Sequence, residues 1–294
     1  MKTGSILVIG STGLLGSTIC ARAGTSSMRA LVRPASRNKV EVLDRAGVEV
    51  AVGDLRDQAS VVAACRGIDT VVSTATAIQS QHPGDSIQTV DHDGQLSLIE
   101  AAEAAGVRRF IYVSFPEQPE EFPLQSAKRA VEQRLRKSRL AFTILQPTLF
   151  QEVWLSAALG FDVGEGRARV YGSGEGKISW ISVRDVADAV FASIGDEAAS
   201  GKTWTLGGPE SLSPNQVVET FNGLLQRPLA TEYVPEATLR AQYESAADPR
   251  ERSFFALALE YSRGRPVAME GQPTIPRPTV TVADYARRLI HQHH

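Results

Sequence analysis

The chain has little of what marks several specialised classes of protein. It carries two cysteines in 294 residues, too few for a disulfide framework, so a reducing, cytoplasmic location is expected. Its 31 basic and 33 acidic residues give a formal net charge of -2, which provides no electrostatic reason to bind nucleic acid or an acidic membrane. No apolar run approaches the length of about 18 residues that spans a bilayer. The composition favours a globular protein that binds a small-molecule substrate, as a monomer or homodimer.

Reactive side chains are also sparse. Cys20 and Cys65 fall in predicted helices, where each thiol is expected to be a core side chain. The five histidines show no metal-ligand spacing, so no metal site is predicted. Three of them, His291, His293 and His294, end the chain and are either natural or the remainder of an expression tag. The first strand begins almost at the N-terminus, which leaves no room for a signal peptide.

The most informative stretch is a short apolar strand followed by three evenly spaced glycines. Residues 5–9 read as a buried parallel strand, and a helix is expected from Ser17 to Ala23. Between them, Gly10 allows a tight turn, Gly13 removes a side chain where a phosphate approaches, and Gly16 lets the helix pack close to the sheet. The spacing is one residue longer than the G-x-G-x-x-G of many dehydrogenases, but its context predicts a dinucleotide site.

The end of the second strand predicts which dinucleotide binds. Residues 28–32 form this strand, and Arg33 follows it. An acidic residue here would bond the ribose 2′-hydroxyl of NAD, whereas an arginine accommodates a 2′-phosphate. Arg33 begins a basic cluster that includes Arg37, with no carboxylate before Glu41. The pattern predicts NADP(H), and the alternative is a solvated basic loop.

Two further strand ends contribute candidate cofactor contacts. The third strand, residues 48–52, is followed by Asp54 and Leu55. Asp54 either accepts a hydrogen bond from the adenine amino group, with Leu55 over the ring, or caps the next helix, and the spacing leaves both open. The fourth strand runs into Thr74 and Ala75, small residues that leave space beside a cofactor ribose.

Strands and helices alternate regularly as far as residue 148. A helix is expected over residues 85–105, a strand over 110–113, a helix over 124–137 and a strand over 142–145. This alternation predicts an α/β protein with a doubly wound parallel sheet, the Rossmann fold. Residues 1–150 are expected to form the NADP-binding domain. Residues 151–294 are expected to complete the sheet and to form a smaller, mostly helical substrate lobe.

One lysine lies on the apolar face of a predicted helix. Leu124, Val131 and Leu135 fall within a narrow arc of the helix, and Lys128 lies in the same arc, whereas Arg129 lies outside it and is expected to be solvated. Lys128 either extends along its stem to solvent or places its ammonium group in the cofactor crevice. In the crevice it would bond ribose hydroxyls and assist proton transfer.

The usual partner of such a lysine is missing. Many short-chain dehydrogenases have a proton-donating tyrosine four residues before the lysine, and here Leu124 stands at that position. None of the six tyrosines precedes a lysine at this spacing. Ser114, at the end of the fifth strand, lies where such enzymes carry a hydroxyl that orients a carbonyl group. Lys128 and Ser114 are therefore the candidate catalytic residues.

The chain resembles the NmrA-like, atypical short-chain dehydrogenase/reductases, which include isoflavone-reductase-like and quinone-reductase-like enzymes. The matching stretches are residues 10–16, 31–33, 53–55, 105–110, 128–132, 143–150 and 180–187. The resemblance implies that Lys128 is a catalytic or ribose-binding lysine and that Pro147 and Phe150 lie near the nicotinamide. Gln146 stands where an arginine is common. The predicted NADP(H) site comprises Gly10, Thr12, Gly13, Leu14, Leu15, Arg33, Arg37, Asp54, Leu55, Thr74, Ala75, Lys128, Pro147 and Phe150.

The leading hypothesis is an NADPH-dependent reductase of a small, apolar carbonyl, enone, quinone or imine. Four aromatic residues are candidates for the substrate pocket, although each could equally belong to the core: Phe115, Phe150, Trp154 and Phe161. The family also has members that bind NADP without demonstrated turnover, so the alternative is an NADP(H)-sensing regulator or assembly factor. A sugar-nucleotide epimerase is a weaker third choice, because that chemistry usually relies on the missing tyrosine.

Overall fold

The computed structural model describes residues 4–22, 27–80, 82–267 and 275–292. Within these ranges, seven parallel strands form one sheet in the order β3-β2-β1-β4-β5-β6-β8. The strands are β1 Ile6–Ile9, β2 Met28–Val32, β3 Glu49–Val52, β4 Thr70–Ser73, β5 Arg109–Val113, β6 Ala141–Pro147 and β8 Lys202–Leu206. The order runs outward from β1 in both directions, as in a doubly wound Rossmann sheet, so the predicted fold class is confirmed.

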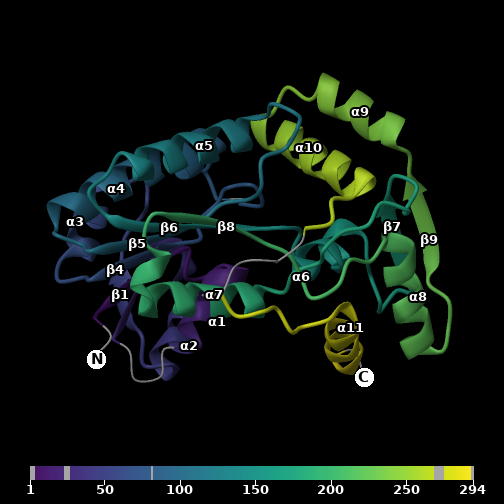
Figure 1. Ribbon diagram of the computed structural model, residues 1–294, viewed down its shortest axis with the longest axis horizontal. Helices are drawn as coiled ribbons and strands as arrows, with labels where there is room; N and C mark the ends of the chain where they lie inside the picture. The colour runs from purple at the N-terminus through teal and green to yellow at the C-terminus, as the bar shows by residue number, and fades with distance from the viewer. Residues whose placement is uncertain (1–3, 23–26, 81, 268–274, 293–294) are drawn as a thin grey trace.

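Helices cover both faces of the sheet (Figure 1). One face carries α3 Gln58–Cys65, α4 Gly94–Ala104 and α5 Pro123–Arg136, and the other carries α1 Leu14–Cys20, α2 Val40–Arg45 and α7 Val183–Gly195. The central strands β1, β4 and β5 are buried along their whole length. This explains their continuous apolar sequence, since a parallel strand covered on both sides has no solvent face.

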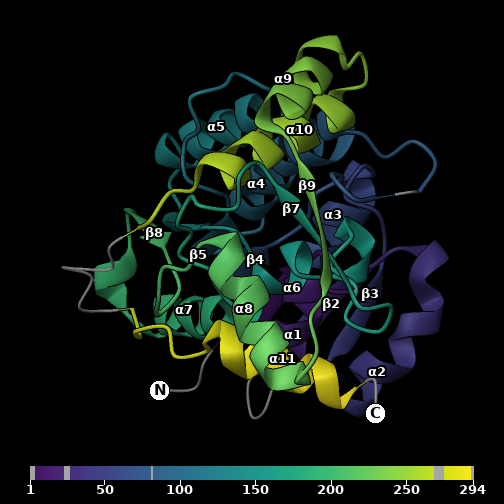
Figure 2. The ribbon, with the colours of Figure 1, turned by 90° about the vertical axis from the view of Figure 1, so that its right-hand side faces the viewer.

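A smaller lobe lies beyond the carboxyl ends of the strands. Its elements are α6 Gln151–Trp154, β7 Arg167–Tyr171, α8 Pro214–Leu225, β9 Ala230–Val234, α9 Glu236–Ser245, α10 Pro249–Arg263 and α11 Val282–His291. Figure 2 shows β7 and β9 side by side, and they pair in parallel. The prediction of a mostly helical lobe named no strand at β9. Most of β9 is exposed, so it lacks the apolar pattern that marks a strand.

The long helix predicted over residues 85–105 is two segments. A π-helical stretch, η2 Ile87–Asp93, precedes α4. At this wider helical turn two polar side chains, Asp91 and Gln95, point into the protein rather than to solvent. Asp91 Oδ2 accepts a hydrogen bond from the Ala77 amide (2.8 Å), and Gln95 Oε1 accepts one from Ser73 Oγ (2.8 Å). π-Helical turns often occur at functional sites, and this one lies beside the end of β4.

The first helix begins earlier than predicted. It spans Leu14–Cys20 rather than starting at Ser17, because Gly13 already has the extended conformation of an N-terminal cap. Cys20 and Cys65 are buried, which confirms the prediction of core thiols. Burial raises the pKa of Cys20 to about 12 and that of Cys65 to about 11, so neither is a ready nucleophile. In the described ranges no helix is both long and apolar enough to cross a membrane.

Candidate functional site

The glycine-rich turn after β1 is packed closely on the backbone around it. Gly10 has a φ of 79°, and a Cβ atom there would come within 2.8 Å of the Ala75 backbone nitrogen. The Gly13 amide donates to the Gly10 carbonyl (2.9 Å). A Cβ atom on Gly16 would overlap the Gly10 carbonyl oxygen. Next to this turn, Leu14 is exposed. The three glycines thus hold α1 against the ends of β1 and β4, as the spacing predicts.

Arg33 is anchored at the end of β2. Its Nη1 atom lies 2.5 Å from Asp85 Oδ2, and Arg56 Nη1 lies 3.4 Å from the other oxygen of the same carboxylate. The Asp85 side chain is 2% exposed and that of Arg33 is 29% exposed. Arg33 is therefore held in place rather than part of a solvated loop, and it still reaches the surface. The Arg37 side chain lies outside the described part of the structure.

Asp54 pairs with a neighbouring arginine rather than with a helix end. It accepts hydrogen bonds from the Arg56 amide (2.9 Å) and Nε (3.0 Å), and these bonds lower the pKa of Asp54. The cap of α3 is Asp57, which accepts from the Ala59 amide (3.1 Å). The capping alternative for Asp54 was wrong, and its adenine contact stays a prediction. Leu55 is buried against α4.

Lys128 points into the protein and not to solvent. It is 5% exposed, and its Nζ atom donates to the Val113 carbonyl at the end of β5 (3.1 Å) and lies 3.9 Å from Asp91 Oδ1. Nζ also lies 5.0 Å from the centre of the Tyr112 ring. Burial lowers the pKa of Lys128, and the Asp91 carboxylate opposes that fall. The structure therefore places a buried cation at the carboxyl edge of the sheet, near the turn formed by Thr74 and Ala75.

Ser114 has a charged partner that the sequence prediction missed. Arg129, expected to be solvated, donates from Nη2 to Ser114 Oγ (3.0 Å) and to the Phe115 carbonyl. It pairs with the buried Glu132 (2.9 Å), which also accepts from Gln146 Nε2 (3.0 Å). Burial lowers the pKa of Arg129. The prediction was wrong because helical periodicity shows only which residues share a face of α5. It does not show that the Ser114 hydroxyl and the Phe115 carbonyl lie beside Arg129 and accept its hydrogen bonds.

A small cavity of about 40 Å³ lies where β5 and β6 end. The predicted residues Phe115 and Pro147 line it, and Phe115 stacks on Phe122 with ring centres 5.9 Å apart. Its other lining residues are Pro116, Gln118, Thr148, Leu149, Ile178, Leu257, Glu260 and Arg265. The last three belong to α10 and the chain after it, and nothing in their local sequence connects them to β5.

The other predicted pocket aromatics do not line this cavity. Trp154 packs against Tyr171 and Tyr261 (ring centres 5.8 and 5.2 Å away), and Phe161 packs against Phe221 (4.8 Å). Both belong to the buried core of the lobe, with Phe161 only 1% exposed. The structure thus places these two side chains as core residues. Phe150 is half-buried and bridges to Ile181 beside β6.

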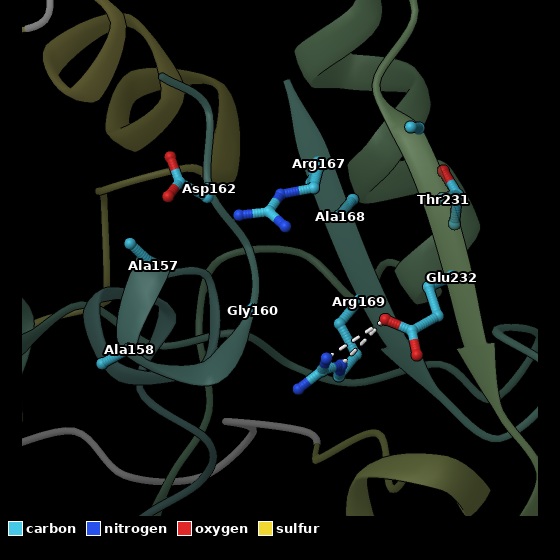
Figure 3. Close-up of a pocket in the computed structure, with 10 residues that line it drawn as sticks. Ala157, Ala158, Gly160, Asp162, Arg167, Ala168, Arg169, Thr231 and Glu232 are labelled. Atoms are coloured by element: carbon cyan, nitrogen blue, oxygen red, sulfur yellow. Dashed lines mark hydrogen bonds and ion pairs between the residues drawn. The ribbon is translucent and has the colours of Figure 1, made fainter. Parts of the chain in front are cut away.

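A wider cavity of about 420 Å³ lies in the lobe (Figure 3). Ala157, Ala158 and Gly160 form one side, and β7 and β9 form the other. Arg169 pairs there with Glu232 (3.1 Å), while Arg167 extends from β7 toward Asp162. None of the predicted cofactor or substrate residues lines this cavity. It is therefore separate from the site at the sheet edge.

The sequence from residue 2 to residue 255 matches the NmrA-like family. This match covers most of the 294 residues. The chain belongs to the NmrA-like family. The resemblance predicted from the glycine turn, Arg33 and Lys128 is confirmed at the level of the family.

Relatives of this NmrA-like protein include enzymes and an assembly factor. An NAD(P)H azoreductase of Xenophilus azovorans is 28% identical over 294 residues and matches over 96% of both chains. A photosystem II assembly factor of Trieres chinensis is 28% identical over 79% of this chain and 72% of its own length. The solved structure of an NADPH-dependent quinone oxidoreductase of Escherichia coli, complexed with NADPH, has a TM-score of 0.73 at 22% identity, covering 97% of this chain and 99% of that one.

Proposed function

We propose that this NmrA-like protein is an NADPH-dependent reductase of a small, apolar carbonyl, enone, quinone or imine. The observation that carries the proposal is the placement of Lys128, Arg33 and the glycine turn at one edge of the sheet, next to a mostly apolar cavity. Two of the relatives described above are NAD(P)H-dependent reductases by name, one of an azo compound and one of a quinone.

The residues at the sheet edge fit a dinucleotide. Gly10 and Gly13 have no side chains, so the turn would let the pyrophosphate approach its backbone. Arg33 would meet the 2′-phosphate, and Asp54 with Leu55 would hold the adenine. Lys128 would bond the nicotinamide ribose, because its ammonium group is held at the end of β5. NADPH, when bound, supplies a hydride.

The cavity beside Phe115 offers apolar surface to a flat acceptor, and its volume of about 40 Å³ must widen to hold an aromatic ring. Phe115, Pro147 and Ile178 provide apolar surface, and Pro147 ends β6, the strand next to β5, where the nicotinamide is expected. Desolvation of an acceptor there strengthens its interaction with the Lys128 charge. The Lys128 charge could therefore assist the reduction even though Leu124 stands where many short-chain dehydrogenases have a proton-donating tyrosine.

Stopped-flow oxidation of NADPH against a panel of quinones, enones, imines and azo compounds tests this function. We expect rapid oxidation with at least one aromatic acceptor and slow oxidation without any. Absence of acceptor-dependent oxidation across the panel would contradict the reductase proposal.

A second candidate, an NADP(H)-sensing assembly factor, is favoured by the missing tyrosine and by the photosystem II assembly factor among the relatives. Such a protein would bind its partner through the lobe formed by α8 to α11. Pull-down from the source cell, with and without NADP(H), separates the two functions. Partner capture that depends on the cofactor, in a protein without turnover, would favour the sensor.

Arg33→Ala is expected to weaken NADPH binding about ten- to a hundredfold and to leave NADH binding nearly unchanged. A charge-assisted contact with the 2′-phosphate contributes roughly 1.5–3 kcal/mol, and NADH has no such phosphate. Calorimetry with both cofactors measures the difference. Arg45→Ala is a suitable control, since Arg45 is largely exposed on α2, where it pairs with Glu41. Equal losses for the two cofactors would rule out the 2′-phosphate contact.

A further inference from the structure

The cavity beside Phe115 contains one acidic side chain among mostly apolar ones. Glu260 lines this cavity and is 8% exposed. Among the residues that the structure describes, none donates a hydrogen bond to its carboxyl group or forms an ion pair with it. The carboxyl oxygens of Glu260 are not among the buried atoms that lack a partner, so the group opens into the cavity, where it can meet a bound acceptor.

The position of Glu260 follows from the register of α10. Ser253 Oγ accepts a hydrogen bond from the Leu124 amide (3.2 Å) at the start of α5, which lies beside α10 (Figure 1). Leu257 and Glu260 follow four and seven residues later and therefore lie on the same face of the helix. This face of α10 is turned toward the end of β5, where Phe115 begins the chain that leads to α5.

The surroundings of Glu260 favour its neutral form. Burial raises its pKa, and the nearby Glu120 carboxylate adds to the rise. Arg265, after α10, and Arg263, on α10, oppose it. Arg263 pairs with Glu120 (2.6 Å), and Arg265, which lines the same cavity, donates to the Glu117 carbonyl. Burial thus shifts the Glu260 carboxyl group toward its protonated form, in which it can donate a proton.

We propose that Glu260 is the proton donor of the reduction, in the place of the missing tyrosine. The proposal rests on the reductase function proposed above. NADPH, when bound, would supply a hydride, a hydrogen with the electron pair of its C–H bond, which would form the new C–H or N–H bond on the acceptor's carbon or nitrogen atom. The O–H bond of Glu260 breaks, and its proton goes to the neighbouring oxygen or nitrogen of the acceptor. The acceptor gains two electrons, NADPH is oxidised to NADP⁺, and the Glu260 carboxylate regains a proton from water.

This arrangement divides the chemistry between two parts of the molecule. Lys128, on α5 beside the Rossmann sheet, keeps its proton and holds the cofactor, whereas Glu260, on α10 of the lobe, protonates the product. The substrate class that fits is an aromatic C=O, C=N or N=N acceptor, in which a heteroatom takes up charge as hydride adds. Such an acceptor needs an acid within hydrogen-bond reach of that heteroatom.

Glu260→Gln tests the proposal, because glutamine keeps the shape but cannot transfer the proton. The single-turnover rate of NADPH oxidation, with the best acceptor of the panel, is expected to fall about a hundredfold. The dissociation constant for NADPH and the KM for the acceptor are expected to change little. Glu260→Asp, which retains the acid on a shorter stem, should recover part of the rate. Glu251→Gln, an exposed position on the same helix, is the matched control.

The pH dependence of the rate distinguishes a proton donor from a residue that only supports the structure, because only the loss of a proton donor changes that dependence. The donor must be protonated, so the wild-type rate falls as pH rises through the raised pKa of Glu260. In the Glu260→Gln variant the rate should not fall over this pH range. Infrared difference spectra between wild type and Glu260→Gln, recorded without cofactor, should show a protonated carboxyl band that persists above the pH at which ordinary glutamic acids ionise.

Three outcomes would overturn the proposal. One is a Glu260→Gln protein as fast as an active wild type. A second is a rise in KM alone, which would make Glu260 a carboxylate that binds cationic acceptors. Both leave the reductase function intact. The third is a wild type that does not oxidise NADPH with any acceptor of the panel. That result would contradict the reductase function together with the role of Glu260.

Discussion

Lys128→Met lowers the single-turnover rate of NADPH oxidation by on the order of a hundred- to a thousandfold. Methionine keeps most of the volume of lysine but removes the cation that donates to the Val113 carbonyl and faces Asp91. A preorganised donor in a buried site, where the dielectric is low, contributes this much to a rate. NADPH affinity should fall as well, because the ribose loses its cationic partner. Stopped-flow kinetics and calorimetry measure the two effects.

A substitution at Asp91 distinguishes the catalytic role of Lys128 from its structural role as the partner of Asp91. Lys128→Met leaves the Asp91 carboxyl group buried without a cation, which destabilises the fold unless Asp91 takes up a proton. Burial already raises the pKa of Asp91. Asp91→Asn combined with Lys128→Met removes both charges, so stability should recover while activity stays low. An active double variant would mean that Lys128 is only a structural cation. Lys137→Met, at the exposed end of α5, is the matched control.

The same pair predicts a loss of NADPH affinity at alkaline pH. Because burial lowers the pKa of Lys128, the ammonium group loses its proton at a lower pH than an exposed lysine. The cation is present below that lowered pKa and disappears as pH rises through it. NADPH affinity, measured by fluorescence across this range, should decline in the wild type. A wild-type affinity that is constant over the range would contradict a role for the Lys128 charge.

Gly16→Ala is expected to destabilise the protein by about 3 kcal/mol or more and to weaken NADPH binding severely. The new Cβ atom would overlap the Gly10 carbonyl oxygen and come within 2.9 Å of the Ser11 Cα atom. Backbone atoms cannot rotate away as a flexible side chain can, so α1 must move off the sheet. The turn that receives the pyrophosphate moves with it. Urea unfolding and calorimetry with NADPH measure the two losses.

Gly223→Ala is the matched control for this substitution. Gly223 also lies within a helix, α8, but it is exposed and a Cβ atom there meets nothing within 4 Å. Alanine favours a helix interior over glycine by roughly 0.5–1 kcal/mol, so this variant should be more stable than the wild type. If both variants shifted stability in the same direction, the close approach of α1 to the sheet would not be the cause.

Local sequence patterns predicted most of the Rossmann half. Buried parallel strands are apolar over their whole length, and the turn at Gly10 requires glycines at fixed spacing, so both can be recognised from neighbouring residues alone. The same local reasoning placed Lys128 on an apolar helix face and Arg33 at the end of a strand. It worked less well beyond residue 150, where the strand β9 is mostly exposed.

Which groups face one another was decided only by the tertiary structure. The sequence by itself determined the fold class, the glycine turn and the candidate residues at the strand ends, because these depend on the period and spacing of nearby residues. It did not pair Arg33 with Asp85 or Ser114 with Arg129, and it did not bring Glu260 to the cavity beside Phe115. Such contacts join residues distant in the chain, and they form only when helices and lobe pack on the sheet.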